Sequence, residues 1–518
     1  MKIQEKKIYG KIYTPNWIVN LILDHLDYKE NIYNKKIIDP ACGDGAFLVI
    51  IVDRFIRDAM NHKIQKKEIK SLLENNIFGI DLDKNAITVC KEQLDQIAAS
   101  YNIYDVEWNL YNEDSTDKSF ISKLFGWFDF VVGNPPYIRI QNLPIKIRNQ
   151  IQNTWSFCQK GSTDIYITFF ELGYFLLNRT GRLGYITPNT YLKTHTAKML
   201  RKFIKSKKIL KELIDFEHHQ LFENATTYSL ITILDKSYNK DVFKLYKGKR
   251  DLIEFIDHVK LSNLNDDNWI LASNQVLERL MHIQNRGIPL GKLAKIHVGL
   301  TTLADDYYIF QNPTFNSKTA EIVLKDGRIF KIEKDILKPI IKASILKDSH
   351  EDQNRYIIFP YKKIKNKHVI IPEDELKSKF PNTYKYFLSI KEILDSRDNH
   401  KPNSVSWYAF GRSQGLDTSF GKKILTSSLN LKPNFIVWEK EEYTFYAGYC
   451  IKFNGNLHRL ANYLNSEDME FYIKYVSRDY QHGYKSYAKS FIEKFGIDDQ
   501  ELLKLYKKDS TQQKELFF

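Results

Sequence analysis

The sequence predicts an α/β protein whose first half is an open, mostly parallel, doubly wound sheet and whose second half is a separate mixed α/β domain. Short apolar runs alternate with helical stretches through roughly the first 240 residues, as they do in βαβ units. A glycine-containing turn directly follows the first of these runs, and the composition changes after about Lys240. Together these observations favour a Rossmann-like first domain.

Each element of the first half follows from a local pattern. Residues 35–59 and residues 75–99 each show an apolar strand, a turn and a helix. Residues 127–138 show a third strand that ends in a proline-bound turn, and residues 164–192 show a long helix followed by a fourth strand. Residues 226–236 are rich in β-branched side chains and predict a later strand of the same sheet.

The second half has a different pattern of apolar and polar residues. Residues 271–287 predict a helix that leads to Pro289. Beyond it, many short aromatic and β-branched runs are broken by Asn, Lys, Gly and Pro. We therefore expect a first domain over residues 1–240, a connector over 241–288 and a second domain over 289–518.

The composition limits the class of protein. The 518 residues include 77 Lys and Arg against 63 Asp and Glu, a net charge of +14, which suits a polyanionic partner such as nucleic acid. The four cysteines lie far apart without a CxxC pair, so neither a disulfide scaffold nor a metal site is expected. The apolar runs are too short to span a bilayer, and we expect a cytoplasmic protein without a membrane segment.

Three carboxylates and a glycine turn follow the predicted strands. Gly43 and Gly45, in the turn after Asp39, allow backbone N–H groups to approach an anionic ligand; a plain tight turn is the alternative. The three-glycine spacing of dinucleotide-binding proteins is absent, which argues against a nicotinamide cofactor. Asp81 ends the second strand, where it could accept hydrogen bonds from ribose hydroxyls, and Asp114 falls where a third strand would end. Alone, either could be an ordinary solvated or capping acid.

The tetrapeptide Asn134-Pro135-Pro136-Tyr137 is the sharpest signal in the sequence. It follows an apolar strand and one glycine. The two prolines fix the backbone so that the Asn134 side-chain oxygen and the Pro135 carbonyl can point the same way and bind both hydrogens of a planar amino group. Tyr137 supplies a ring on which a flat base could stack. The alternative is a rigid turn with a packed tyrosine.

The ordered set of motifs resembles the γ class of S-adenosylmethionine-dependent adenine-N6 DNA methyltransferases, of which the TaqI enzyme is the familiar member. YTPNWIVNLIL is similar to motif X of that family, DPACGDGAFL to motif I and GIDLD to motif II. NEDSTD is similar to motif III, GNPPY to motif IV, DIYITFF to motif V, GYITPNTYL to motif VI and LFENATTYSLITIL to motif VIII. The likeness covers residues 9–235 and continues more loosely through the C-terminal half.

The resemblance implies a class I methyltransferase domain with S-adenosyl-L-methionine as its cofactor. It implies that Asp81 holds the ribose, that Asp114 holds the adenine amine of the cofactor, and that Phe169 is an aromatic near it. The other implied cofactor-binding residues are Tyr13, Thr14, Pro15, Asp39, Ala41, Gly43, Gly45 and Asn134. Ser115 departs from relatives that place an apolar or aromatic residue there. Phe169 could equally be a side chain of the hydrophobic core with no contact to the cofactor.

The resemblance also implies the catalytic residues and the acceptor. Asn134, Pro135, Pro136 and Tyr137 would bind an adenine that is flipped out of duplex DNA, and Phe222 would stack on its other side. The domain over residues 289–518 would then be the target-recognition domain. Arg412 and Gln414 have side chains suited to guanine and adenine edges, and Lys485 lies in a basic and aromatic segment; a solvated loop is the alternative for these.

Other functions share parts of this pattern. RNA guanine methyltransferases and protein-glutamine methyltransferases also use an NPPY motif, and an inactive DNA-specificity subunit could keep the fold. The large C-terminal domain and the motif X ahead of motif I favour duplex DNA. Because the sequence begins almost at motif X, we expect a cognate restriction endonuclease, if there is one, to be a separate chain, and the enzyme to be a monomer in a restriction-modification system.

Overall fold

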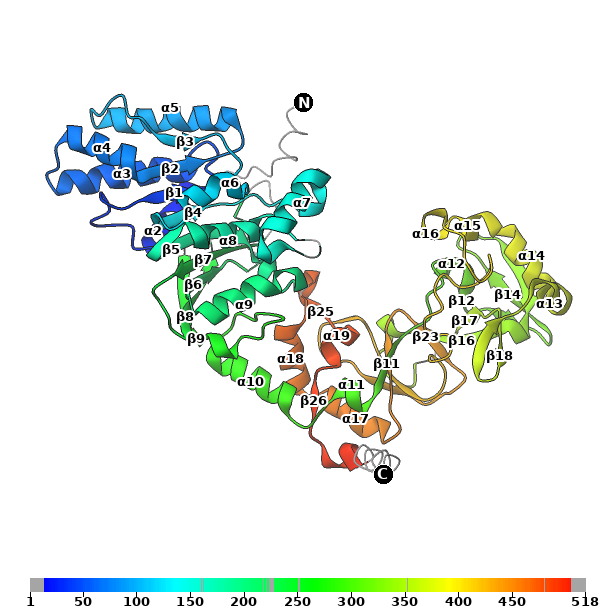
Figure 1. The fold of residues 1–518 in the computed structure, drawn as a ribbon. Coiled ribbons are helices and arrows are strands. Elements are labelled where there is room, and N and C mark those ends of the chain that lie inside the picture. The colour runs from blue at the N-terminus through cyan, green and yellow to red at the C-terminus, as the bar shows by residue number, and fades with distance from the viewer. Residues whose placement is uncertain are drawn as a thin grey trace, which may run out of the picture. The chain divides into compact units, whose positions relative to one another are not determined.

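The computed structural model describes residues 14–504, except residues 160, 162, 218, 220, 223–227, 250, 251, 352 and 479. The chain divides into two compact units, Met1–Glu278 and Arg279–Phe518 (Figure 1). No described helix is long and apolar enough to cross a membrane. Tyr13, one of the expected cofactor-binding residues, lies outside the described residues.

The first unit is built on a nine-stranded sheet with the order β3-β2-β1-β4-β5-β7-β6-β8-β9. Strands β1 to β5 run parallel, β7 runs antiparallel between β5 and β6, and β8 pairs parallel with β6. The last strand, β9, is antiparallel to β8. The strands are β1 Ile37–Asp39, β2 Ile77–Ile80, β3 Asn109–Tyr111, β4 Phe128–Gly133, β5 Leu177–Pro188, β6 Leu210–Asp215, β7 Ser229–Asp235, β8 Val242–Lys249 and β9 Leu252–Lys260.

Helices precede, connect and follow these strands, and the connecting ones are those expected of a doubly wound sheet. They are α2 Asn16–His25, α3 Ala46–Asn61, α4 Lys66–Asn76, α5 Lys84–Ser100, α6 Lys118–Ile121, α7 Ile145–Thr154, α8 Tyr166–Leu176, α9 Lys198–Lys207 and α10 Asn274–Asn285. A Cβ at Gly184 of β5 would meet Ile22 of α2 and Leu26 just after it, whereas a Cβ at Gly173 of α8 would meet Leu183 and Tyr185 of β5. Helices α2 and α8 therefore approach β5 closely.

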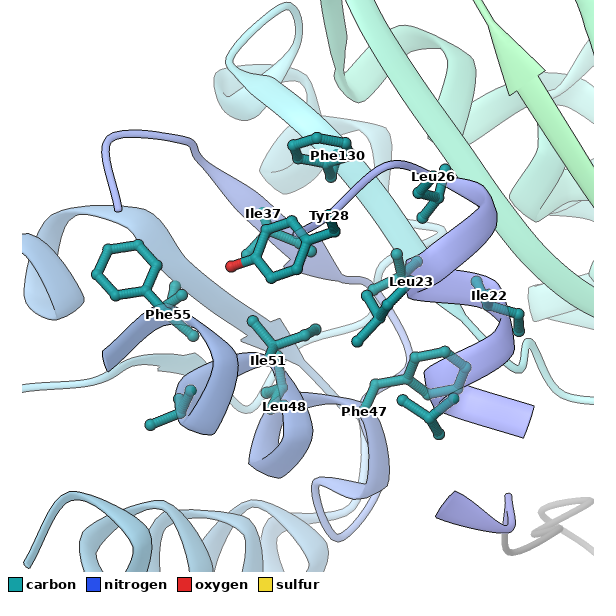
Figure 2. Packing of buried hydrophobic residues seen from close by; sticks show 14 of the residues in the cluster. Ile22, Leu23, Leu26, Tyr28, Ile37, Phe47, Leu48, Ile51, Phe55 and Phe130 are labelled. Carbon is teal, nitrogen blue, oxygen red and sulfur yellow. The ribbon is translucent and has the colours of Figure 1, made fainter. Parts of the chain in front are cut away.

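The core of the first unit lies between the sheet and helices α2 and α3. Figure 2 shows Leu23 and Tyr28, from and just after α2, on the side of Leu48 and Ile51 of α3. The ring of Tyr28 meets Phe130 of β4 edge-on, with 5.2 Å between centroids. Each fully buried large apolar side chain contributes roughly 1.5–3 kcal/mol, so this layer fixes the position of α3 and of the turn that precedes it.

The second unit is mixed α/β, as predicted. Its larger sheets have the orders β11-β24-β20-β22, β12-β17-β16-β23 and β13-β14-β15. Its strands are β10 Ile288–Pro289, β11 Lys295–Val298, β12 Ile309–Gln311, β13 Thr314–Phe315, β14 Thr319–Val323, β15 Ile329–Glu333, β16 Leu337–Lys342, β17 Arg355–Ile358, β18 Tyr361–Ile364, β19 Lys367–Ile370, β20 Lys423–Thr426, β21 Leu429–Asn430, β22 Ile436–Trp438, β23 Thr444–Tyr446, β24 Tyr449–Lys452, β25 Lys485–Ser486 and β26 Gly496–Ile497. Its helices are α11 Leu290–Leu293, α12 Asp305–Tyr308, α13 Glu373–Lys379, α14 Pro381–Ser389, α15 Lys391–Asp395, α16 Arg397–His400, α17 Leu457–Leu464, α18 Glu467–Val476 and α19 Lys489–Ile492.

The expected boundary at residue 240 is wrong. Val242–Lys249 and Leu252–Lys260 form β8 and β9, which extend the central sheet instead of forming a connector. Apolar and polar residues alternate in these two strands, because a strand near the edge of a sheet is only half buried. The sequence therefore resembles that of the second half. The predicted helix over residues 271–287 is confirmed as α10, and the division between the two units falls within it.

Candidate active site

Three functional segments meet at one edge of the central sheet. Asp39 ends β1, Asp81 follows β2 and Asn134 follows β4, and the three strands are neighbours in the order β2-β1-β4. Because parallel strands end at the same edge, the segments that follow them lie together. This edge is where an open α/β sheet binds its ligands.

The glycine turn after β1 is held by backbone contacts with β2. The Cys42 N–H donates to the Ile80 carbonyl at 3.0 Å, and the Gly43 N–H donates to Asp81 at 2.9 Å. Gly43 has a φ of +54°, and a Cβ built on it would meet no described atom within 4 Å, so the turn leaves open space here. Gly45, with a φ of +96°, lies close instead: its Cβ would be 2.8 Å from the sulfur of Cys90 in α5.

Asp81 anchors the loop after β2. One carboxylate oxygen accepts from Gly43, and the other accepts from the Asp83 N–H at 2.8 Å. Each carboxylate oxygen has a second lone pair, so the same group can also accept from the hydroxyls of a ribose.

Asp114 lies in a turn that packs on the glycine turn. Its side chain accepts from the N–H and the hydroxyl of Thr116, at 2.8 and 2.7 Å. The adjacent Ser115 hydroxyl donates to the Pro40 carbonyl at 2.5 Å. Ser115, the departure from the family pattern, therefore ties the turn of Asp114 to the turn after β1. No local sequence pattern indicates this hydrogen bond.

Asn134 carries an unsatisfied acceptor. Its amide nitrogen donates to the Thr14 hydroxyl oxygen at 3.1 Å, while its side-chain oxygen is buried and accepts no hydrogen bond from any described residue. An unpaired buried amide oxygen costs about 1–3 kcal/mol, so such atoms are rare in the interior of a protein. Thr14 orients the amide so that its oxygen is the atom available to a ligand.

Gly133, which sequence reasoning did not single out, joins the Asn134 segment to Asp39. Its φ is +150°, and a Cβ at this position would be 2.6 Å from a carboxylate oxygen of Asp39. The absence of a side chain lets the end of β4 lie directly against Asp39. A glycine immediately before the tetrapeptide was the available signal.

Asp39 is buried, with 1% of its surface exposed. Burial raises the pKa of its carboxyl to about 8; the hydrogen bond from the Ala41 N–H lowers it, and the nearby Asp81 charge raises it further. A carboxyl with a pKa near neutrality can take up or release a proton when a charged ligand binds.

The aromatic residues differ in their surroundings. The Tyr137 hydroxyl donates to the Ile186 carbonyl at 3.3 Å, and its ring meets Tyr166 of α8 edge-on at 6.2 Å. Burial raises the pKa of Tyr137 well above its usual value, so the hydroxyl stays a donor. Phe169 is buried in α8, and Phe222 is 4% exposed within the apolar core of the first unit. The stacking role of Phe222 stays a prediction.

In the second unit, no described contact joins the three candidate DNA-contacting residues to one another. The Arg412 guanidinium pairs with both carboxylate oxygens of Asp398, at 2.9 and 3.1 Å. The guanidinium group is therefore already engaged in an ion pair, and the sequence did not indicate this pairing. Gln414 is exposed, and Lys485 lies in β25. Within the described residues, no three His, Cys, Asp or Glu side chains form a group that could hold a metal ion.

The order of the central sheet, with β7 antiparallel between β5 and β6, is that of class I S-adenosylmethionine-dependent methyltransferases. The structure of the Type IIL restriction-modification enzyme MmeI in complex with DNA has a similar fold: the TM-score is 0.52 at 13% identity, covering 92% of this chain and 64% of that chain. The open space at Gly43 and the unsatisfied oxygen of Asn134 fit S-adenosyl-L-methionine, the cofactor of this class, together with an acceptor.

Sequence comparisons relate the chain to particular methyltransferases. Residues 75–222 match the family of Eco57I restriction-modification methylases. The chain is 28% identical to the Type II restriction enzyme and methyltransferase RM.Eco57I of Escherichia coli, over 80% of this chain and 49% of the relative. It is 26% identical to the Type II methyltransferase M.BstVI of Geobacillus stearothermophilus, over 95% of this chain and 90% of the relative. The chain thus spans about half of the first relative and most of the second.

Proposed function

We propose that the protein is a site-specific DNA methyltransferase that transfers a methyl group from S-adenosyl-L-methionine to the N6 amine of adenine. The buried, unpaired side-chain oxygen of Asn134 carries this proposal. It lies beside the Pro135 backbone, at the same sheet edge as the glycine turn and Asp81. An acceptor at this position suits an amino group that donates two hydrogen bonds. The similarity to Type II methyltransferases supports DNA as the substrate.

The reaction requires an exocyclic amine, a weak nucleophile, to attack a carbon. When bound, the cofactor supplies a methyl group on a positively charged sulfur. The Asn134 oxygen and the Pro135 carbonyl accept the two amine hydrogens, which favours a pyramidal nitrogen and directs its lone pair toward the methyl carbon. The same acceptors stabilise the positive charge that develops on the nitrogen. The C–S bond breaks as the N–C bond forms, and the extra proton leaves to water.

The adenine must leave the DNA helix to reach Asn134, because its amine is paired inside a duplex. Stacking on Tyr137 would contribute about 1–3 kcal/mol toward the flipped state. Its hydroxyl bond to Ile186 and its contact with Tyr166 hold the ring in place. We further propose that the second unit recognises the target sequence and that a separate restriction endonuclease cleaves unmodified sites.

The acceptor class is tested by methyl transfer from labelled cofactor to duplex DNA, RNA and protein, measured in parallel. We expect label in duplex DNA, and affinity for DNA that falls steeply with added salt. Preferential labelling of RNA or of protein glutamine would overturn the proposal, and so would cofactor binding without any turnover.

Cofactor binding should depend on pH through Asp39. If the ammonium group of the cofactor lies beside this carboxyl, binding favours its charged form. Because its pKa in the free protein is about 8, binding below pH 8 releases a proton. The dissociation constant should therefore fall by up to roughly tenfold per pH unit as the pH rises toward about 7, below the range in which the α-amino group of the cofactor loses its own proton.

Isothermal titration calorimetry in buffers of different ionisation enthalpy measures this proton release. Asp39→Asn should bind the cofactor more weakly and lose the pH dependence below pH 8. A pH dependence that Asp39→Asn retains would assign the proton to another group.

A further inference from the structure

The segment between Tyr137 and α8 leaves the active-site edge and returns to it. Its two ends are paired at the base: the Ile140 N–H donates to the Thr163 carbonyl at 2.9 Å, and the Ile165 N–H donates to the Ile138 carbonyl at 2.8 Å. The excursion is therefore attached immediately beside the Asn-Pro-Pro-Tyr turn.

The residues that follow α7, where the segment returns to the site, are held by hydrogen bonds. The Trp155 indole N–H donates to the Thr116 carbonyl at 3.0 Å, in the turn of Asp114. The buried Glu171 carboxylate of α8 accepts from the N–H groups of Ser156 and Phe157, at 3.1 and 2.9 Å. These contacts fix the C-terminal end of α7 to the framework of the site.

The other end of α7 exposes apolar side chains. Ile145, in the first turn of the helix, is 70% exposed and Ile147 is 36% exposed, whereas Ile151 is buried. Pro144, which precedes the helix, is also exposed. The Arg148 side chain donates to the carbonyls of Gln141 and Leu143 and so braces the turn that leads into Pro144. Figure 1 shows α7, in cyan, at the rim of the first unit.

The charge around this apolar tip indicates its partner. No Asp or Glu occurs between Asp129 and Asp164, while the tip is flanked by Lys146 and Arg148. A segment without acidic residues suits the phosphate backbone of DNA. Proteins that distort DNA insert exposed Ile, Leu or Pro side chains between bases and place basic residues against the phosphates.

We propose that the tip formed by Pro144 and Ile145 inserts into the DNA stack at the position that the flipped adenine vacates, with Lys146 against a neighbouring phosphate. This proposal rests on the proposed function, because it requires duplex DNA at the Asn-Pro-Pro-Tyr turn. Ile145 would replace part of the stacking that the DNA loses, and so favour the flipped state before methyl transfer.

The test compares Ile145→Ser with wild type on two duplexes, after the modified site has been located by sequencing. One duplex is fully paired; the other has an abasic nucleotide opposite the target adenine, which lowers the energy needed for flipping. We expect Ile145→Ser to slow single-turnover methylation of the paired duplex at least about tenfold. On the abasic duplex its rate should be close to that of wild type, and Ile145→Leu should retain activity on both.

Leu252→Ser is the matched control, since Leu252 is 72% exposed on β9, at the far edge of the same sheet. It should methylate both duplexes at the wild-type rate. An equal loss on both duplexes with Ile145→Ser, or no loss on either, would overturn the proposed insertion of Ile145 into the DNA stack. Failure of wild type to methylate any duplex would instead overturn the proposed function.

Discussion

Replacement of Asn134 by alanine is expected to lower the rate of methyl transfer by at least about 10²–10³-fold, the range for removal of one preorganised polar group at a reacting centre. The side-chain oxygen of Asn134 accepts no hydrogen bond from the described residues, and alanine offers no acceptor in its place. The fold should persist, because within the described part of the chain the side chain makes one hydrogen bond, to Thr14, and removal of its buried oxygen also removes an unsatisfied group. Single-turnover methylation of DNA at saturating cofactor measures the effect.

The control separates chemistry from binding. The dissociation constant of the cofactor for Asn134→Ala should stay within a few-fold of wild type. Thr14→Val removes the oxygen that orients the amide, and it should give a smaller loss that Thr14→Ser restores. A variant Asn134→Ala that methylates at the wild-type rate would show that the oxygen takes no part in the reaction.

Replacement of Gly133 by alanine is expected to damage activity and stability together. The new Cβ would lie 2.6 Å from the Asp39 carboxylate, and the φ of +150° is one that residues with a side chain rarely adopt. Strain of this kind is of order 1–3 kcal/mol, which lowers the Tm by several degrees. Because Asn134 is the next residue, even a small shift of the backbone should reduce the rate by about 100-fold. Thermal unfolding and single-turnover methylation measure the two effects.

A double-mutant cycle identifies the cause. Asp39→Ala removes the atoms that the new Cβ would meet, so the Tm loss of Gly133→Ala combined with Asp39→Ala should be smaller than the sum of the two single losses. Additive losses would mean that backbone strain alone explains Gly133→Ala and that contact with Asp39 contributes nothing.

The order of elements around the site could be predicted from the sequence because it depends on local patterns. Apolar runs of strand length, each followed by Asp39, Asp81 or the Asn134 segment, place these residues at one edge of any parallel sheet. The paired prolines likewise restrict the backbone after Asn134 without help from distant residues. The structure brings these segments together as that pattern predicts.

The features that could not be predicted depend on contacts between distant segments. The bond from Ser115 to Pro40 and the close approach of Gly133 to Asp39 exist only once the sheet has formed. The burial that raises the Asp39 pKa is also a property of the assembled fold. Strands β8 and β9 could not be predicted, because half-buried strands lack the continuous apolar runs of the central strands. The pairing of Arg412 with Asp398 likewise joins residues fourteen positions apart in an irregular region.

In the proposed reaction, Asn134 presents an acceptor to the N6 amine of a flipped adenine. Mass spectrometry of nucleosides from duplex DNA, incubated with isotopically labelled S-adenosyl-L-methionine and either wild type or Asn134→Ala, tests it most directly. We expect labelled N6-methyladenine with wild type and none above background with the variant. Label on cytosine, or equal N6-methyladenine with both proteins, would contradict it.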